Sequence, residues 1–126
     1  MEKIKTNIYD SANAASVVVA DKIAKQINNA AVEDRSFVLG LATGSTPLGV
    51  YRELISKVRK GEISFKNTYS FNLDEYYGIG PEHPESYRRF MDHHFFSQID
   101  IPPENTFVPD GLIPRSDLPS YCKSYE

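Results

Sequence analysis

Two short polar segments carry the residue types that chemistry on a small phosphorylated molecule would need. The first, Ala42-Thr-Gly-Ser-Thr-Pro47, places three hydroxyl side chains and a glycine directly after an apolar run. At a junction between a strand and a helix, free backbone amides and the positive end of the helix dipole favour an anion such as phosphate. The residues predicted to surround it are Ala42, Thr43, Gly44, Ser45 and Thr46. The alternative is a turn whose hydroxyls only cap the helix.

The glycine spacing of this segment narrows the kind of anion. It matches neither Gly-x-x-x-x-Gly-Lys-Ser/Thr, which is typical of nucleoside triphosphate sites, nor Gly-x-Gly-x-x-Gly, which is typical of dinucleotide sites. A sugar phosphate or a similar small anion is therefore the ligand to expect.

The second segment, Phe71-Asn-Leu-Asp-Glu-Tyr76, carries two adjacent acids, Asp74 and Glu75. In open α/β sheets, ligands bind just outside the carboxyl ends of the strands, so the two segments are expected to flank one crevice. A carboxylate there could take a proton from a carbon next to a carbonyl group. The alternative is that Asp74 only organises a turn and that Glu75 is a solvated acid.

The other reactive side chains give weaker signals. His93 and His94 are adjacent in a predicted helix, so they face different directions and do not form a metal-binding pair. Cys122 is the single cysteine and has no histidine nearby in the sequence, which favours a buried or bystander thiol. We therefore predict no metal site. The lack of any internal disulfide is typical of a reducing compartment.

The spacing of apolar residues and of turn residues predicts the elements that hold these segments. The first is a helix capped by Asp10 or Ser11 that ends near Asn28-Asn29, followed by a strand over Ser36–Ala42. The next helix has Thr46 as its N-cap and Pro47 as its first residue and stops at Gly61, and a strand over Thr68–Asp74 follows it. The remaining elements are a helix around Tyr87–Phe95, a short strand over Thr106–Val108 and a last helix from Ser116 to Glu126.

These elements predict an α/β protein with a Rossmann-like parallel sheet flanked by helices. The strand, helix and strand between Ser36 and Asp74 have the length and order of a βαβ unit. The first strand lacks strict alternation of apolar and polar residues, which suits burial on both faces. Two or three strands form a narrow sheet, whose faces and edges need further cover. Residues 1–126 are therefore expected to be the incomplete amino-terminal part of a single domain.

Composition excludes several classes of function. The chain has 126 residues, of which 40% are hydrophobic and 25% are charged, which is typical of a folded soluble protein. Its net charge of −3 argues against binding of nucleic acid through bulk electrostatics. The amino terminus has no apolar signal core, and no apolar run is long enough to cross a membrane. We expect a cytoplasmic protein whose partner is a small molecule, with no nucleic acid and no membrane.

Taken together, several ordered motifs between Phe37 and Tyr125 resemble the glucosamine-6-phosphate deaminase family. They are Leu39-Gly-Leu-Ala-Thr-Gly-Ser-Thr-Pro47, Tyr51, Phe71-Asn-Leu-Asp-Glu-Tyr76, His83-Pro-Glu-Ser-Tyr87 and Phe90-Met91. The resemblance implies conversion of glucosamine 6-phosphate and water to fructose 6-phosphate and ammonia, a step of amino-sugar catabolism. It implies no metal or organic cofactor. Family members often assemble, so the resemblance also implies a homo-oligomer.

The resemblance assigns roles to individual residues. Asp74 matches the aspartate base that moves a proton between C1 and C2 of the opened sugar, and the segment from Ala42 to Thr46 matches the turn around the phosphate. Glu75 and Tyr87 match positions beside the substrate. Family members are longer, and their ring-opening histidine and remaining phosphate ligands lie after the position of Glu126. The resemblance therefore implies an amino-terminal portion that is inactive alone.

Two alternatives to the deaminase remain. A 6-phosphogluconolactonase resembles it in fold and phosphate loop, although the Asn72–Tyr76 and His83–Tyr87 segments favour the deaminase. A non-catalytic sugar-phosphate sensor is the other alternative. Such sensors usually follow a helix-turn-helix region, and the residues before the first strand hold only one predicted helix.

Overall fold

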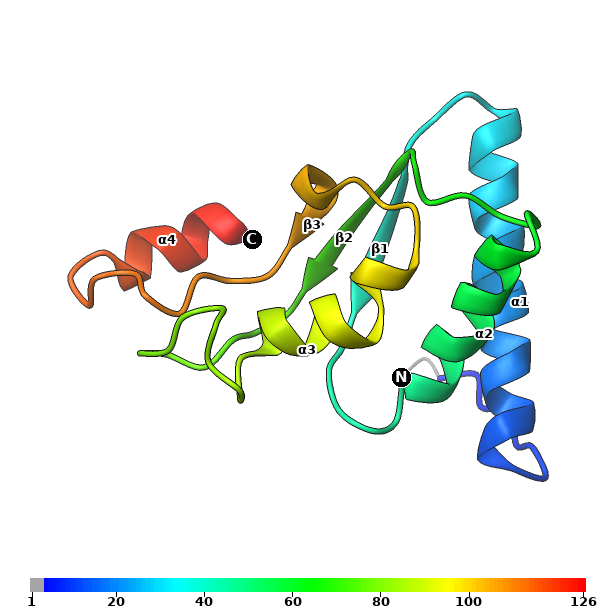
Figure 1. Ribbon diagram of the computed structural model, residues 1–126, viewed down its shortest axis with the longest axis horizontal. Helices are drawn as coiled ribbons and strands as arrows, with labels where there is room; N and C mark the ends of the chain where they lie inside the picture. Colours follow the sequence, from blue (N-terminus) through cyan, green and yellow to red (C-terminus); the bar gives the residue numbers. More distant parts are fainter. Residues whose placement is uncertain (1–3) are drawn as a thin grey trace.

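The computed structural model describes residues 4–126 and contains every helix and strand that the sequence predicts (Figure 1). In chain order the elements are α1 (Ala12–Val32), β1 (Phe37–Leu41), α2 (Leu48–Arg59), β2 (Thr68–Asn72), α3 (Tyr87–His94), the 3-10 helices η1 (Phe96–Gln98) and η2 (Pro103–Asn105), β3 (Thr106–Phe107) and α4 (Leu118–Tyr125). Among the described residues, no helix is both long and apolar enough to cross a membrane.

The three strands form a parallel sheet in the order β1-β2-β3. Leu41 at the end of β1 pairs with Asn72 at the end of β2, so the carboxyl ends of these strands are level. Asn72 strengthens this alignment, because its side-chain amide donates to the carbonyl oxygen of Leu41 at 3.3 Å. The two loops that leave this edge therefore start side by side.

One face of the sheet is covered by α2, α3 and η1. Tyr51 of α2 stacks on Phe95, which directly follows α3, with ring centroids 4.6 Å apart, and Phe65 meets Phe95 edge-on at 5.6 Å. Leu54 and Met91 are fully buried in the same cluster. Burial of such apolar side chains stabilises the fold by about 1.5–3 kcal/mol each. This core holds the start of α2 against the sheet, close to the first polar segment.

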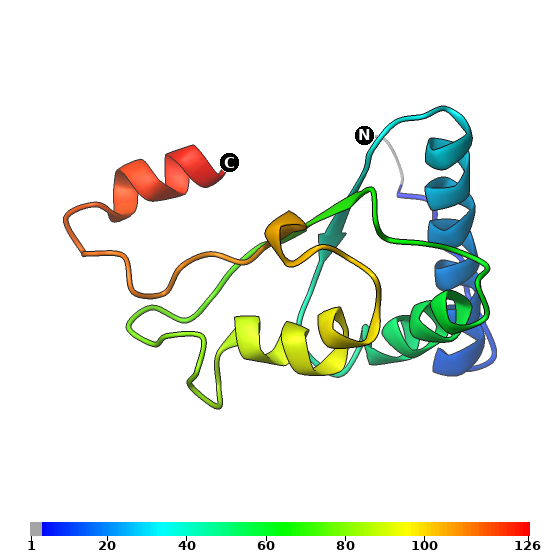
Figure 2. The ribbon, with the colours of Figure 1, turned by 45° about the horizontal axis from the view of Figure 1, so that its top comes forward.

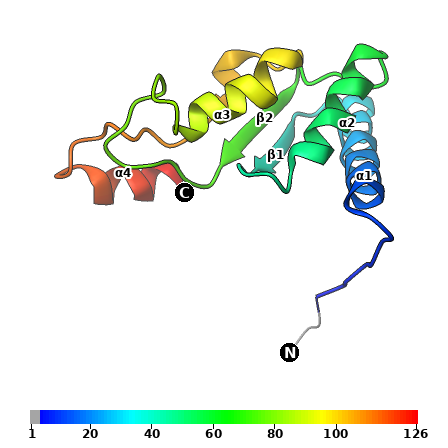
Figure 3. The ribbon, with the colours of Figure 1, turned by 60° about the horizontal axis from the view of Figure 1, so that its bottom comes forward.

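The opposite face of the sheet is open in residues 4–126. Val38 is 63% exposed and Phe107 is 38% exposed, and Phe71 stacks on Phe107 at 4.7 Å. Figure 3 shows α3 on one side of β2, with the other side turned away from α2 and α3. The prediction that β1 is buried on both faces is thus wrong for the described residues, because both crossover helices pack on the same side.

α1 packs along α2 near the β1 edge (Figure 1). Ser11 caps α1 as predicted, accepting from the amide of Ala14 at 3.1 Å. Gly49 lets the two helices approach closely, since a Cβ atom there would lie 2.4 Å from the hydroxyl of Ser16. The predicted end at Asn28-Asn29 is wrong: the helix continues to Val32, because Asn28 donates outward to the carbonyl oxygen of Glu62 instead of breaking the helix.

α4 lies at the opposite end of the molecule from α1 and α2 (Figure 2). Its Tyr125 hydroxyl donates to the carbonyl oxygens of Asn72 at 2.7 Å and Phe107 at 3.2 Å. This residue therefore ties α4 to the carboxyl ends of β2 and β3. Cys122 on the same helix is exposed, which leaves the bystander interpretation and excludes the buried one.

Candidate active site

The two polar segments leave the aligned ends of β1 and β2, and the structure brings them together. Thr43 and Asp74 each lie two residues beyond the paired residues Leu41 and Asn72. The Tyr87 hydroxyl lies beside the Thr43 hydroxyl and close to the Asp74 carboxylate. Side chains from both loops and from the start of α3 thus meet at one edge of the sheet, where parallel α/β proteins bind ligands.

The loop after β1 is exposed and leaves hydrogen-bond donors available. Gly44 adopts a φ of +97°, a conformation that glycine permits and other residues rarely adopt. α2 begins at Leu48, one residue later than predicted, because the Leu48 amide donates to the carbonyl oxygen of Ser45 and closes a turn over Thr46 and Pro47.

No side chain of the described residues caps α2, so the prediction that Thr46 is its N-cap is wrong. The interpretation in which the loop hydroxyls only cap the helix loses its basis for the same reason. The uncapped first turn, with the helix dipole behind it, favours an anion at this loop.

Tyr51 fixes this loop from beneath. It is 3% exposed, and its hydroxyl accepts from the amide of Ala42 at 3.2 Å and donates to the carbonyl oxygen of the same residue. Burial raises the pKa of Tyr51, with a smaller opposing effect from the Ala42 hydrogen bond, so the hydroxyl stays protonated. Because the Ala42 amide is already bonded, the donors left for a ligand come from Thr43 to Thr46 and from the first turn of α2.

The second loop carries Asp74 two residues beyond the end of β2. Its side chain is exposed, and no donor in the described part of the chain bonds to its carboxylate. It lies at the ligand edge of the sheet and next to the Tyr87 hydroxyl. A carboxylate in this state is free to accept a proton from a bound molecule.

Glu75, by contrast, is hydrogen-bonded to other groups of the protein. Its carboxylate accepts from the Ser86 hydroxyl at 2.7 Å and from the amides of Tyr76 at 2.8 Å, Tyr87 at 2.9 Å and Arg88 at 2.9 Å. Partial burial alone would raise the pKa of this carboxyl, but the four hydrogen bonds outweigh it and the pKa lies below its ordinary value. The alternative in which Glu75 is only a solvated acid is therefore excluded, and its carboxylate points at the start of α3.

Tyr87 joins the two loops. Its ring lies 4.8 Å from that of Tyr76. A hydrogen bond with the Tyr76 hydroxyl has the largest effect and raises the pKa of Tyr87, and partial burial and the negative charge of Asp74 act in the same direction. The Thr43 hydroxyl opposes these effects. A neutral hydroxyl in this place can donate to a ligand held by the first loop.

The comparisons with known proteins identify the family of this chain. A family model described as glucosamine-6-phosphate isomerases/6-phosphogluconolactonase matches residues 10–125. The chain belongs to this family. The resemblance inferred from the sequence motifs is thereby confirmed.

Curated members of the isomerase/lactonase family align over most of the chain. A glucosamine-6-phosphate deaminase of Thermoanaerobacter sp. (strain X514) is 47% identical over 123 residues, which are 98% of this chain and 45% of the relative. A protein of the same name from Aeromonas hydrophila subsp. hydrophila is 53% identical over 93 residues, which are 74% of this chain and 34% of the relative. The chain thus spans less than half the length of these relatives.

Solved structures of this family have the same fold. A monomeric glucosamine-6-phosphate deaminase superposes with a TM-score of 0.87 at 36% identity, covering 98% of this chain and 48% of that chain. A 6-phosphogluconolactonase from Thermotoga maritima gives a TM-score of 0.69 at 25% identity, covering 87% of this chain and 47% of that chain. The predicted α/β fold with a parallel sheet flanked by helices is confirmed.

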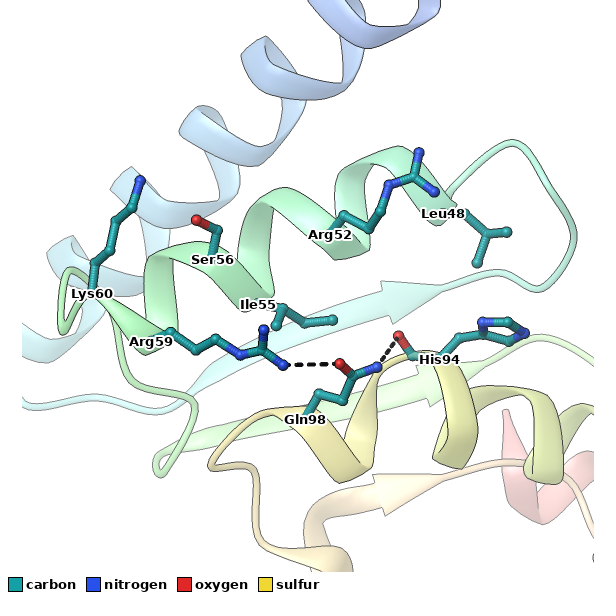
Figure 4. A pocket seen from close by; sticks show the side chains of 8 residues that line it. All are labelled: Leu48, Arg52, Ile55, Ser56, Arg59, Lys60, His94 and Gln98. Carbon is teal, nitrogen blue, oxygen red and sulfur yellow. Dashed lines mark hydrogen bonds between the residues drawn. The ribbon is translucent and has the colours of Figure 1, made fainter.

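Two cavities lie near the sheet, and one of them borders the two acids of the site. A pocket of about 290 Å³ borders Asp74 and Glu75 and continues along α4 to Tyr125. A larger cavity of about 530 Å³ runs along α2 from Leu48 to Lys60 and faces His94 and Gln98 (Figure 4). Arg59, which donates to Gln98 at 3.1 Å, lies in the last turn of α2, and Lys60 follows it. Cations there stabilise the helix dipole, so their presence needs no ligand.

Two features of this site are not predicted from the sequence. Tyr51 is one of the residues that carry the family resemblance, but its hydrogen bonds to Ala42 are not predicted from the sequence. The capping role of Glu75 was missed as well, although Ser86 before a helix is a typical N-cap signal, and it does accept from the amide of Arg89 at 3.3 Å. Within residues 4–126, no three His, Cys, Asp or Glu side chains are grouped to hold a metal ion.

Proposed function

We propose that the full-length protein converts glucosamine 6-phosphate and water to fructose 6-phosphate and ammonia. The observation that carries this proposal is the exposed carboxylate of Asp74, which no donor among residues 4–126 bonds, beside a loop with free donors at the ends of β1 and β2. The deaminases among its relatives support the choice of substrate. The chemistry makes the protein a hydrolase of a carbon–nitrogen bond that also isomerises the sugar, with a place in amino-sugar catabolism.

The proposed reaction divides the work between the two loops. The hydroxyls and amides from Thr43 to Thr46, next to Ala42, bind the phosphate and fix the sugar chain. Asp74 takes the proton from C2 of the opened aldose and returns it to C1, so the enolamine becomes the imine of the ketose. Water then adds at C2 and ammonia leaves. Holding the sugar by its phosphate makes the proton transfer effectively intramolecular, which lowers the entropic barrier.

Tyr87 and Glu75 complete the proposed site. The Tyr87 hydroxyl, next to Thr43 and Asp74, is positioned to donate to a sugar oxygen. Glu75 is the weaker candidate for substrate contact, because four donors already occupy its carboxylate. The proposed reaction uses no metal and no organic cofactor.

We further propose that residues 1–126 are the amino-terminal part of one sugar-phosphate isomerase/deaminase-like domain and lack full activity alone. The open sheet face at Val38 and Phe107 supports this proposal, because apolar strands of a parallel sheet are normally covered on both sides. The greater length of the relatives supports it as well. A cytoplasmic location and a homo-oligomer remain predictions; one solved relative is described as monomeric.

The substrate is tested with the full-length protein. We expect release of ammonia and fructose 6-phosphate from glucosamine 6-phosphate, and no hydrolysis of 6-phosphogluconolactone. Turnover of the lactone alone would favour the lactonase alternative, which the 25% identical relative represents. Binding of glucosamine 6-phosphate without any product would favour a sensor and contradict the proposal.

A further inference from the structure

The segment between β2 and α3 has site residues at both of its ends. Asp74 lies just after β2, and Tyr87 is the first residue of α3. The residues between them form turns rather than a helix or strand, so local secondary structure does not fix the distance from Asp74 to Tyr87. Something else must hold the two ends together, since catalytic geometry is sensitive to displacements of about 1 Å.

Glu75 spans the two ends of this segment. Its backbone directly follows Asp74, and one carboxylate oxygen accepts from the amides of both Tyr76 and Tyr87. The other oxygen accepts from the Ser86 hydroxyl and from the amide of Arg88. All four donor–acceptor distances lie between 2.7 and 2.9 Å, the range of strong charge-assisted hydrogen bonds. A single side chain thus closes the loop.

The Glu75 carboxylate and its four donors form a clamp between the end of β2 and the start of α3, and every bond in it favours an ionised carboxylate. The amides of Tyr87 and Arg88 belong to the first turn of α3, where free donors and the positive end of the dipole favour a carboxylate. Ser86 satisfies the next amide, that of Arg89, and donates its own hydroxyl proton to Glu75. The start of α3 is therefore fully capped by Glu75 and Ser86 together.

The far side of Glu75 is packed against a second loop. A Cβ atom at Gly111 would lie 3.4 Å from the Cγ atom of Glu75 and 2.3 Å from the carbonyl oxygen of Tyr76. The amide of Gly78 also donates to the carbonyl oxygen of Gly111 at 2.7 Å. The turn that carries Glu75 is thus held from both sides, and this contact restricts the positions that its side chain can adopt.

We infer that Glu75 is a positioning residue, whose carboxylate holds the base Asp74 and the hydroxyl of Tyr87 at a fixed separation across the substrate. This inference rests on the proposed function, since it assigns Asp74 as the base. It differs from a substrate-binding role for Glu75, because the four protein donors leave the carboxylate little capacity for a ligand. It also differs from a purely structural role, because its effect is on turnover in the folded enzyme.

Glu75→Gln in the full-length protein tests the inference, with Glu82→Gln as the matched control. Glu82 is an exposed glutamate in the same loop whose side chain has no partner in the described residues. In Glu75→Gln an NH2 group replaces one carboxylate oxygen and faces at least one backbone amide, from which it cannot accept a hydrogen bond. We therefore expect kcat to fall about 10- to 100-fold, the cost of a displacement of about 1 Å. Affinity for inorganic phosphate, which reports the loop after β1, should change less than twofold.

Further outcomes separate the roles. Ser86→Ala, which removes one of the four donors, should reduce kcat in the same direction by a smaller factor. A normal kcat in folded Glu75→Gln would overturn the inference. A raised KM with unchanged kcat would also overturn it, and would restore substrate binding as the role of Glu75.

Failure of the proposed function is distinguishable from failure of this inference. If the wild type releases no ammonia, hydrogen exchange at the amides of Tyr87 and Arg88 still reports on the clamp. Faster exchange in Glu75→Gln than in Glu82→Gln would support the clamp in a protein of other function. Equal exchange in both variants would overturn it.

Discussion

The loops after β1 and β2 start level with each other, yet they use their polar groups in opposite ways. The loop after β1 is supported from below by Tyr51 and leaves its hydroxyls and the first turn of α2 free. Of the two adjacent acids at the start of the loop after β2, Glu75 points into the protein, and Asp74 meets no hydrogen-bond donor in the described residues. The loop after β1 offers several donors to a ligand, whereas the loop after β2 places the Asp74 carboxylate beside them.

This difference explains how two adjacent acids can have different tasks. Glu75 meets four donors and has a lowered pKa, so it remains ionised and bound to the protein. Asp74 meets none in the described residues and lies near Tyr87. A carboxylate that takes a proton from the substrate must be accessible to it, whereas a carboxylate that positions other residues must be fully hydrogen-bonded to them. Substitutions at four positions test this contrast between the two loops.

Asp74→Asn replaces the exposed carboxylate after β2 with a neutral amide, which cannot take up the substrate proton. We expect kcat of the full-length protein to fall by about 10²–10⁴-fold, the usual contribution of a general base. Binding of glucosamine 6-phosphate should remain, because the phosphate loop is untouched. Steady-state kinetics and calorimetric binding measure the two effects. Equal turnover in mutant and wild type would remove the distinction between Asp74 and Glu75.

Gly44→Ala changes the loop after β1, which carries the hydrogen-bond donors. At a φ of +97° an alanine is strained by about 1–3 kcal/mol, so the loop should reshape and its donors should move. We expect KM for glucosamine 6-phosphate to rise by about tenfold, equivalent to about 1.4 kcal/mol, with little change in kcat. Gly61→Ala is the control, because Gly61 has a φ of +72° at the far end of α2. A similar KM for both variants would show that strain near the loop does not matter.

Tyr51→Phe removes the support beneath the first loop without changing the size of the core. The two hydrogen bonds to Ala42 are lost, which should reduce the free energy of unfolding by about 1–2 kcal/mol. KM should rise a few-fold as the loop loosens, by less than in Gly44→Ala. Thermal melts and kinetics on Tyr9→Phe, whose hydroxyl has no partner in the described residues, give the control. Unchanged KM would separate Tyr51 from the anion site.

The smallest expected effect is a pH-dependent difference in stability between wild type and Glu75→Gln. Folding lowers the pKa of Glu75, so its stabilising contribution is fully present above the ordinary value of 4.5 and is lost as pH falls through the lower folded value. We expect the variant to be less stable at pH 7 by about 1 kcal/mol, the typical value of a helix cap. The gap should narrow below pH 4.5 in thermal melts. A constant gap at all pH values would contradict an ionised clamp.

The fold was largely predictable because its signals are local. The apolar spacing of residues 48–58 and the short apolar runs before Thr43 and Asp74 are enough to predict α2, β1 and β2 and to align the two loops. Errors arose where tertiary contacts decide: α1 passes Asn28 because that side chain finds Glu62. The start of α2 was one residue early because a turn at Ser45 precedes it.

The hydrogen bonds within the site were not predictable, because they too depend on tertiary contacts. The donors to Glu75 from Ser86 and from the first turn of α3 lie eleven to thirteen residues away in the sequence, and no pattern in the residues between them indicates that the loop folds back. The Tyr51 hydroxyl reaches back from α2 to the amide of Ala42 after β1. The apolar spacing of α2 predicts that Tyr51 faces inward but does not indicate this hydrogen bond. Residue types could therefore predict which groups were available, but not which of them the protein had already used.

The most direct test of the central claim follows one hydrogen atom. Glucosamine 6-phosphate carrying deuterium at C2 is given to the full-length wild type and to Asp74→Asn. Wild type should move the label to C1 or into water as fructose 6-phosphate forms. Asp74→Asn should bind the labelled sugar and return it with the deuterium still at C2. Transfer of the label by the mutant at the wild-type rate would contradict Asp74 as the base.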